Sequence, residues 1–302
     1  MFSFSGVRQR VKTGWFWLIG DLPEIEREQS NGLLWWMGVW IGLAMLLGTF
    51  HNLGGPPPSR GLWRMAAHGL VPLCGLSLWC SWKEGQRLGM VLAFVATVFV
   101  LTPFLAREYD PALTKVFKTQ SIWLFGSFIP SFVFASVALY LGRIDLKYWG
   151  IGLGDWRWWL PRVAIVAGAM IPTILVVMML DPQMAEFYPT WKPARNYVFK
   201  LYMLILSYLF DLAGWELLFR GLLLFLFARR GDALVAIWVQ VFPFFLLHAD
   251  KPYFELLTSF VGGLLSGWFC LRAGCFWPLF LLHWLQISWV SVVGFLLANS
   301  FI

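Results

Sequence analysis

The stretch Asp211-Leu-Ala-Gly-Trp-Glu-Leu-Leu-Phe-Arg220 decides how the rest of the sequence is interpreted. It lies inside a long apolar run, Leu201–Phe227, and contains an acid and a base four residues apart. On a helix Glu216 and Arg220 therefore share one face. Ionised side chains in lipid-buried helices are costly, and they usually face an internal cavity and serve a function. We therefore expect a functional ion pair here; a structural pair that ties helices together is the alternative.

Two histidines are the next polar residues in apolar surroundings. His248 ends the segment Phe242-Pro-Phe-Phe-Leu-Leu-His248, and His283 lies within Leu279-Phe-Leu-Leu-His283-Trp. A single histidine in such a run is more often a packing residue than a ligand or a base. Together with Glu216 and Arg220, however, the two histidines predict one polar site in the last third of the chain.

Composition identifies the broad class of protein. Of 302 residues, 59% are hydrophobic and only 13% are charged, whereas soluble domains carry about 25% charged residues. The chain is therefore expected to be an integral membrane protein. Its net charge of +7 fits attraction to anionic lipid. We find no basic aromatic motif for nucleic acid, and we expect no nucleic-acid partner.

Apolar runs long enough to form membrane helices predict the fold class, an all-α polytopic transmembrane bundle. Two of the runs are short, so we expect about eight or nine membrane helices. Lys147–Trp159 is predicted to lie at the membrane interface, and Val11–Leu22 is predicted either to lie there or to be a solvated tail. Residues 1–200 would form N-terminal membrane helices with these interfacial segments, and residues 201–298 a catalytic core within one integrated membrane domain. The nine runs are Leu33–Phe50, Ala66–Trp82, Leu88–Leu105, Ile122–Leu141, Leu160–Leu180, Leu201–Phe227, Ala233–Leu247, Phe254–Leu271 and Phe276–Ala298.

Three motifs carry a family resemblance. Glu216-x-x-x-Arg220, Phe244-x-x-x-His248 and the later His283 resemble the motifs of the CPBP family. Its members are the CAAX-protease and bacteriocin-processing intramembrane endopeptidases, related to type II CAAX prenyl proteases. The resemblance covers about residues 201–298. It implies that Glu216 is the general base, that His248 orients the water, that His283 faces the oxyanion and that Arg220 holds Glu216.

Two departures from the family pattern leave alternatives open. Trp215 stands where the family usually has a second glutamate, and Ile287 stands where it usually has asparagine or aspartate. Gln286 is an amide one residue earlier, which on a helix points about 100° away. A catalytically inactive membrane scaffold or binding relative is therefore the main alternative to a protease, and a transporter is a further one.

The resemblance also bears on cofactors, partners and location. Glu216, His248 and His283 are compatible with a catalytic zinc ion, but the sequence contains no His-Glu-x-x-His helix motif. We expect no cofactor, with zinc as the open alternative. The expected partners are the lipid bilayer and a membrane-associated or lipidated protein or peptide substrate. The expected location is the bacterial inner (plasma) membrane, crossed several times.

Overall fold

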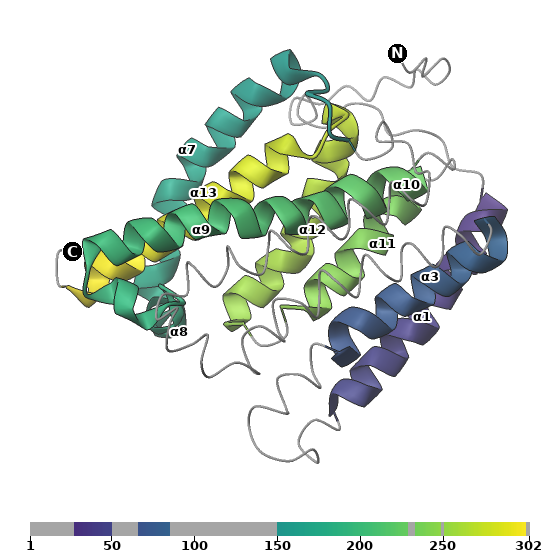
Figure 1. The fold of residues 1–302 in the computed structure, drawn as a ribbon, viewed down its shortest axis with the longest axis horizontal. Coiled ribbons are helices and arrows are strands. Elements are labelled where there is room, and N and C mark those ends of the chain that lie inside the picture. The colour runs from purple at the N-terminus through teal and green to yellow at the C-terminus, as the bar shows by residue number, and fades with distance from the viewer. Residues whose placement is uncertain (1–26, 50–65, 85–149, 229–232, 249–250, 300–302) are drawn as a thin grey trace.

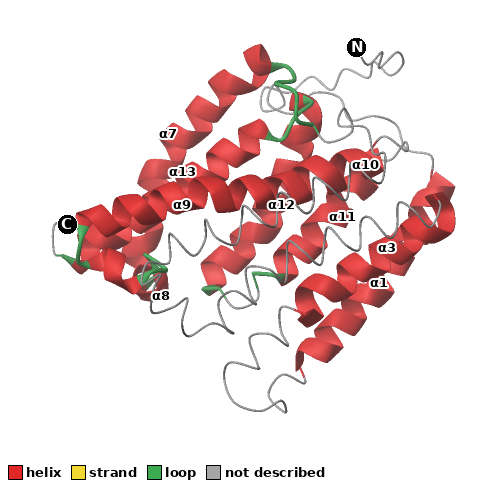
Figure 2. Ribbon diagram, in the orientation of Figure 1, coloured by secondary structure: helices red, strands yellow, loops and turns green. Residues whose placement is uncertain are grey.

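The computed structural model describes residues 27–49, 66–84, 150–228, 233–248 and 251–299. Every regular element in these ranges is a helix, and the described residues include no strand (Figure 2). The predicted all-α fold is confirmed.

Four helices are long and apolar enough to cross a membrane. They are α7 (Trp156–Leu180), α9 (Val198–Glu216) with the π-helical turn Leu217–Leu223 that continues it, α12 (Tyr253–Ala273) and α13 (Trp277–Ala298). Two apolar helices are shorter: α11 (Ala233–Leu246), and Trp35–Leu47 within α1 (Arg27–Thr49). The chain is thus an integral membrane protein, while the count of eight or nine spans remains a prediction.

Seven of the nine predicted runs coincide with helices. The first two correspond to α1 and to the segment Ala66–Glu84, which comprises a π-helical turn and α3 (Val71–Glu84). The other five correspond to α7, α9, α11, α12 and α13; the run that contains Glu216 also covers α10 (Leu224–Ala228). Leu88–Leu105, Ile122–Leu141 and Val11–Leu22 lie outside the described residues.

The predicted interfacial segment Lys147–Trp159 is described from residue 150 onward. Its described part is a loop that leads into the first turn of α7. Asp155 caps that helix, because its side chain accepts a hydrogen bond from the Trp158 amide. The Asp155 amide donates to the Ala273 carbonyl at 2.8 Å. Gly154, with φ +55°, allows this close approach, since a Cβ there would meet the same carbonyl oxygen at 2.0 Å.

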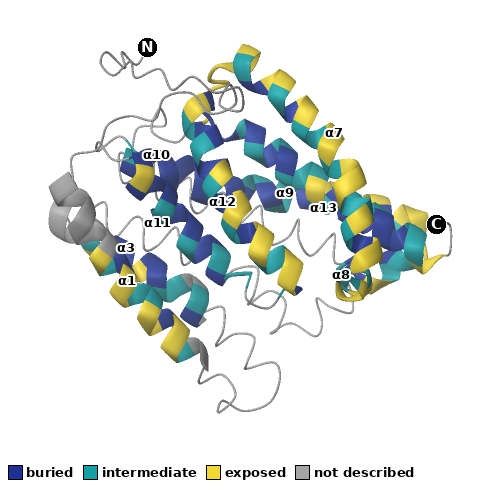
Figure 3. Cartoon of the chain, turned by 180° about the vertical axis from the view of Figure 1, so that it is seen from behind, coloured by how far each residue is buried: buried dark blue, intermediate teal, exposed yellow. Residues whose placement is uncertain are grey.

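The helices around α9 differ in how deeply they are buried. α13 packs against both α7 and α9, and α11 packs against α12 (Figure 1). The residues from Leu217 to Phe225 are all buried, whereas α7 is largely exposed (Figure 3). The exposed residues of α7 include apolar side chains such as Ile165, Val176 and Met179. In an integral membrane protein such side chains face lipid, so α7 is a peripheral helix and the region after Glu216 is the centre of the bundle.

The connection between α7 and α9 closes one end of the bundle. It contains α8 (Pro182–Phe187) and the 3₁₀ turn Lys192–Arg195. Between them, Tyr188 is 1% exposed, and its hydroxyl donates to Glu255 of α12 at 2.8 Å. Burial, and then the nearby Glu255 carboxylate, raises the pKa of Tyr188 well above its usual value. The phenol therefore stays protonated and keeps its role as donor.

The first prediction concerns the contact between this connection and α13. At Gly294, an added Cβ would lie 2.5 Å from the Tyr188 carbonyl oxygen and 2.8 Å from its carbon. Both atoms belong to the backbone, so Gly294→Ala must displace α13 or the connection. We expect a loss of about 1–3 kcal/mol in the free energy of unfolding, the usual cost of overpacking. Equilibrium unfolding in mixed micelles measures it.

Gly168 in α7 provides the matched control. An added Cβ there meets nothing within 4 Å, and alanine is the better helix former. Gly168→Ala should therefore be neutral or slightly stabilising. Equal stability of the two variants would contradict the proposed contact.

Candidate functional site

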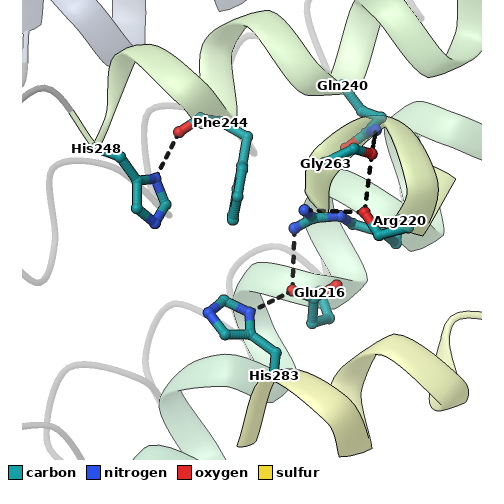
Figure 4. A network of polar contacts seen from close by, with 8 residues as sticks. Glu216, Arg220, Gln240, Phe244, His248, Gly263 and His283 are labelled. Atoms are coloured by element: carbon teal, nitrogen blue, oxygen red, sulfur yellow. Dashed lines mark hydrogen bonds and ion pairs between the residues drawn. The ribbon is translucent and has the colours of Figure 1, made fainter. Parts of the chain in front are cut away.

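Glu216 is the centre of a buried polar cluster. It is the last residue of α9, and its side chain is 1% exposed. Its Oε1 atom accepts a hydrogen bond from Arg220 Nη1 at 3.0 Å and another from His283 Nδ1 at 2.7 Å (Figure 4). The structure thus brings together three of the four residues that the sequence predicted.

Arg220 connects this centre to α11 and α12. It is 3% exposed, and its Nη2 atom donates to Ser266 Oγ at 3.3 Å. Ser266 Oγ in turn donates to the Gly263 carbonyl at 2.9 Å, and so does Gln240 Nε2 of α11, at 2.9 Å. Ser266 and Gln240 thus belong to the network. Sequence analysis missed them, since a serine and a glutamine in apolar runs carry no motif of their own.

The backbone around Arg220 is not a regular α-helix. Leu217–Leu223 forms a π-helical turn between α9 and α10. Such wide turns often lie at functional sites, because the extra residue per turn re-aims the side chains that follow. The charged end of α9 therefore lies where the helix is locally remodelled, which the i, i+4 spacing alone did not predict.

His248 joins the cluster through an aromatic ring. It follows α11, and its Nδ1 atom lies 2.7 Å from the Phe244 carbonyl. Since a carbonyl only accepts, Nδ1 donates and Nε2 is left as an acceptor. The imidazole lies 4.4 Å from the Phe244 ring, and the Arg220 guanidinium lies 3.8 Å from the centre of that ring. Figure 4 shows the phenyl group between the two.

The four predicted site residues therefore form two groups. Glu216 contacts His283 directly, whereas His248 packs on Phe244, whose ring centre is also 6.0 Å from the His283 ring. All four predicted residues lie around Phe244, but the described contacts include no hydrogen bond between His248 and Glu216. The ring sets the spacing between His248 and the ion pair.

The zinc alternative requires three ligand side chains to meet at one point. Among the described residues, no group of three histidine, cysteine, aspartate or glutamate side chains could hold a metal ion. The alternative ligand set of Glu216, His248 and His283 is not assembled. Phe244 lies beside His248, and the Glu216 Oε1 atom is already bonded to two donors. The expectation that no cofactor is needed stays a prediction.

The positions where the chain departs from the family pattern have apolar environments. The Trp215 ring stacks on Phe219 at 5.5 Å with an interplanar angle of 3°. Ile287 packs against the hydrophobic core, whereas Gln286 is exposed. The Gln286 side-chain amide therefore does not join the cluster, and Ile287 has no polar group to offer. Trp215 contributes packing through this stack.

One oxygen of the central carboxylate has no partner. Glu216 Oε2 is buried and forms no hydrogen bond with any described residue. Buried polar atoms are nearly always satisfied, so an exception calls for an explanation such as a bound water or a catalytic role. Glu216 thus has one oxygen fixed by two donors and one oxygen free to accept a proton.

Fold and site together define a helical integral membrane protein with an acid, a base and two histidines gathered among its helices. Residues 197–288 match the family model described as Type II CAAX prenyl endopeptidase Rce1-like. All four predicted site residues lie inside the matched range. The match supports the family resemblance of the motifs over this part of the chain. Comparisons with curated proteins and with solved structures found no match.

The second prediction tests the buried ion pair. Arg220→Met removes the cation at similar length and leaves Glu216 as an uncompensated buried charge. Breaking a buried pair in this way costs about 3–5 kcal/mol. We expect a loss of that size in the free energy of unfolding, measured in mixed micelles.

The double variant Arg220→Met with Glu216→Gln is the matched control. It removes both charges, so much of the lost stability should return. If the two substitutions were simply additive, the coupling inferred from the 3.0 Å contact would be wrong.

Proposed function

We propose that the protein is an intramembrane endopeptidase that hydrolyses a peptide bond of a membrane-associated or lipidated protein or peptide. The observation that carries this proposal is the unequal environment of the two Glu216 oxygens. The match of residues 197–288 supports a protease at the level of the family. A water activated by Glu216 is the finer part of the proposal.

The first chemical step uses the free oxygen. Arg220 and His283 hold Oε1 and so fix the plane of the carboxylate, while Arg220 stabilises its ionised form. A water molecule on Oε2 passes a proton to that atom and attacks the carbonyl carbon of the substrate. When the C–N bond breaks, the leaving nitrogen takes this proton from Glu216, which regenerates the carboxylate.

The two histidines would assist the same step, His283 at the oxyanion and His248 at the water. His283 donates from Nδ1 to Glu216, and its Nε2–H would donate to the oxyanion that develops on the carbonyl oxygen. His248 donates from Nδ1 to the Phe244 carbonyl, so its Nε2 lone pair would accept the second hydrogen of the water. Each role requires the ring orientation that these hydrogen bonds fix.

An inactive scaffold is the competing function. The observations that favour it are Trp215 and Ile287, which replace polar groups of the family pattern with apolar ones. A scaffold and a protease differ in one measurable property, the appearance of cleaved membrane proteins.

The third prediction is therefore a substrate capture. Wild-type protein and Glu216→Gln are expressed in matched membranes, and new protein termini are quantified by mass spectrometry. Wild type should generate new termini, because it cleaves, whereas Glu216→Gln should reduce them about 10²–10⁴-fold, the range for loss of a general base. The uncleaved proteins should co-purify with the variant.

Glu186→Gln is the matched control. It makes the same carboxylate-to-amide change at an exposed residue of α8, and it should match wild type. Equal termini from wild type and Glu216→Gln would reject the protease and favour the scaffold.

The fourth prediction concerns metal removal. Since the described residues assemble no three-ligand set, purified protein should keep its activity after exhaustive treatment with a strong chelator. The measurement is the rate of appearance of the termini found by substrate capture. Loss of that rate on chelation, restored by stoichiometric zinc, would make Glu216, His248 and His283 the metal ligands instead.

A further inference from the structure

Ser266 is a buried polar residue of α12 that lies outside the three motifs, and the chemistry proposed above does not use it. It is 5% exposed. Its hydroxyl donates to the Gly263 carbonyl, three residues earlier, at 2.9 Å. The same oxygen accepts a hydrogen bond from Arg220 Nη2 at 3.3 Å. A hydroxyl has one proton and two lone pairs. Donation to Gly263 therefore turns the proton away from the cation and leaves the oxygen to accept.

The contact with Arg220 distinguishes Ser266 from another buried serine of the same helix. A serine hydroxyl inside a helix commonly bonds to a carbonyl one turn earlier, which is a local effect. Ser259 does this with the Leu256 carbonyl at 2.7 Å, and it lies seven residues before Ser266, on the same face of α12. In the described contacts the Ser259 side chain forms no second hydrogen bond. Ser266 has the same local bond and, in addition, a charged partner on another helix.

The bond to Ser266 fixes the orientation of the Arg220 guanidinium. Nη1 donates to Glu216 at 3.0 Å and Nη2 donates to Ser266, whereas Nε forms no hydrogen bond with any described residue. The Phe244 ring lies 3.8 Å from the guanidinium carbon, but an aromatic face offers no single acceptor atom to which an N–H must point. With the Glu216 bond alone, the planar group could pivot about that contact. A second bond from a different nitrogen removes this freedom.

Gln240 of α11 holds the acceptor of the Ser266 hydroxyl. It is 0% exposed, and its Nε2 atom donates to the same Gly263 carbonyl at 2.9 Å. Gly267 leaves room for this amide, since an added Cβ there would lie 2.8 Å from Gln240 Nε2. A chain of hydrogen bonds therefore runs from α11 through Gly263 and Ser266 of α12 to Arg220 (Figure 4).

We propose that Ser266 is a positioning residue of the site: its hydroxyl orients the Arg220 guanidinium, which in turn fixes the Glu216 carboxylate. The proposal rests on the role given to Glu216 in the proposed function. Ser266 does not touch the substrate; it acts through Arg220. If the guanidinium turns, the carboxylate bonded to it tilts, and Oε2 moves relative to the water that it activates. Gln240 acts one step further away, through the Gly263 carbonyl.

The fifth prediction is a loss of kcat without a change in KM. Ser266→Ala removes the acceptor of Arg220 Nη2, and a misplacement of about 1 Å at the reacting atoms can cost about 10²-fold in rate. We expect kcat to fall about 10- to 100-fold, while KM stays the same because Ser266 does not bind substrate. Ser266→Thr retains a hydroxyl that can bond to a carbonyl one turn earlier, so it should restore most of kcat. Steady-state cleavage of a substrate found by capture measures both constants.

Ser259→Ala is the matched control. It removes a buried hydroxyl from the same face of α12, but one that contacts only its own helix. This variant should have the kcat of wild type. Equal kinetics of Ser266→Ala and Ser259→Ala, or a Ser266→Thr variant as slow as Ser266→Ala, would overturn the proposal.

Equilibrium unfolding in mixed micelles tests the contact without any substrate. Ser266→Ala should lower the midpoint of unfolding, because it leaves an N–H of a buried cation without an acceptor. The same substitution should have a smaller effect in the double variant Arg220→Met with Glu216→Gln, which lacks that donor. Ser259→Ala should shift the midpoint equally in both backgrounds. Equal shifts for Ser266→Ala in the two backgrounds would reject the contact with Arg220.

Gln240→Met tests the part of the chain that comes from α11. It removes the amide at similar length and should lower kcat. In combination with Ser266→Ala it should add little further loss, because both residues act on Arg220 along one path. Gln286→Met makes the same change at an exposed residue of α13 and should match wild type. Losses that multiply in the double variant would overturn the role given to Gln240.

The two proposals fail separately. If Ser266→Ala had the kcat of wild type while Glu216→Gln was inactive, only the positioning role of Ser266 would be rejected. If Glu216→Gln cleaved like wild type, the proposed function would be rejected, and the unfolding experiment would still decide whether Ser266 holds Arg220.

Discussion

The contact between Arg220 and Glu216 is the interaction on which the rest of the site depends. A carboxylate that is 1% exposed inside a membrane protein needs an opposite charge in contact, because lipid and packed side chains do not solvate it. Arg220 provides that charge from the same helix and reaches Ser266 of α12 with its other nitrogen. The pair therefore fixes both the state of the carboxylate and the position of α12 relative to α9.

The Phe244 ring packs between the charged pair and His248. Its ring lies 3.8 Å from the Arg220 guanidinium and 4.4 Å from the His248 ring. A cation over an aromatic face is stabilised more strongly when it is desolvated, so the ring supports the buried Arg220 guanidinium. The same ring holds His248 away from Glu216. One apolar side chain thus divides the polar residues into a bonded group, Glu216 with Arg220 and His283, and a separate histidine.

Much of this arrangement could be predicted from the sequence, for reasons that are local. Apolar runs predicted α7, α9 with α10, α11, α12 and α13 to within a few residues, because membrane thickness limits the length of a spanning helix. The i, i+4 spacing predicted the contact of Glu216 with Arg220. The partner of each imidazole depends on how α11 and α13 pack, and spacing carries no such information. The π-helical turn after Glu216, and the recruitment of Ser266 and Gln240, follow from packing between helices distant in sequence.

Trp215 and Ile287 stand at positions where the family pattern has polar residues, yet the central contacts of Glu216 are formed without them. Each lies in packed apolar surroundings, so neither leaves an unsatisfied buried group behind. The bonds of Glu216 with Arg220 and His283 involve neither side chain. The geometry of the Glu216 carboxylate is therefore set by two groups that both departures leave in place, Arg220 and His283.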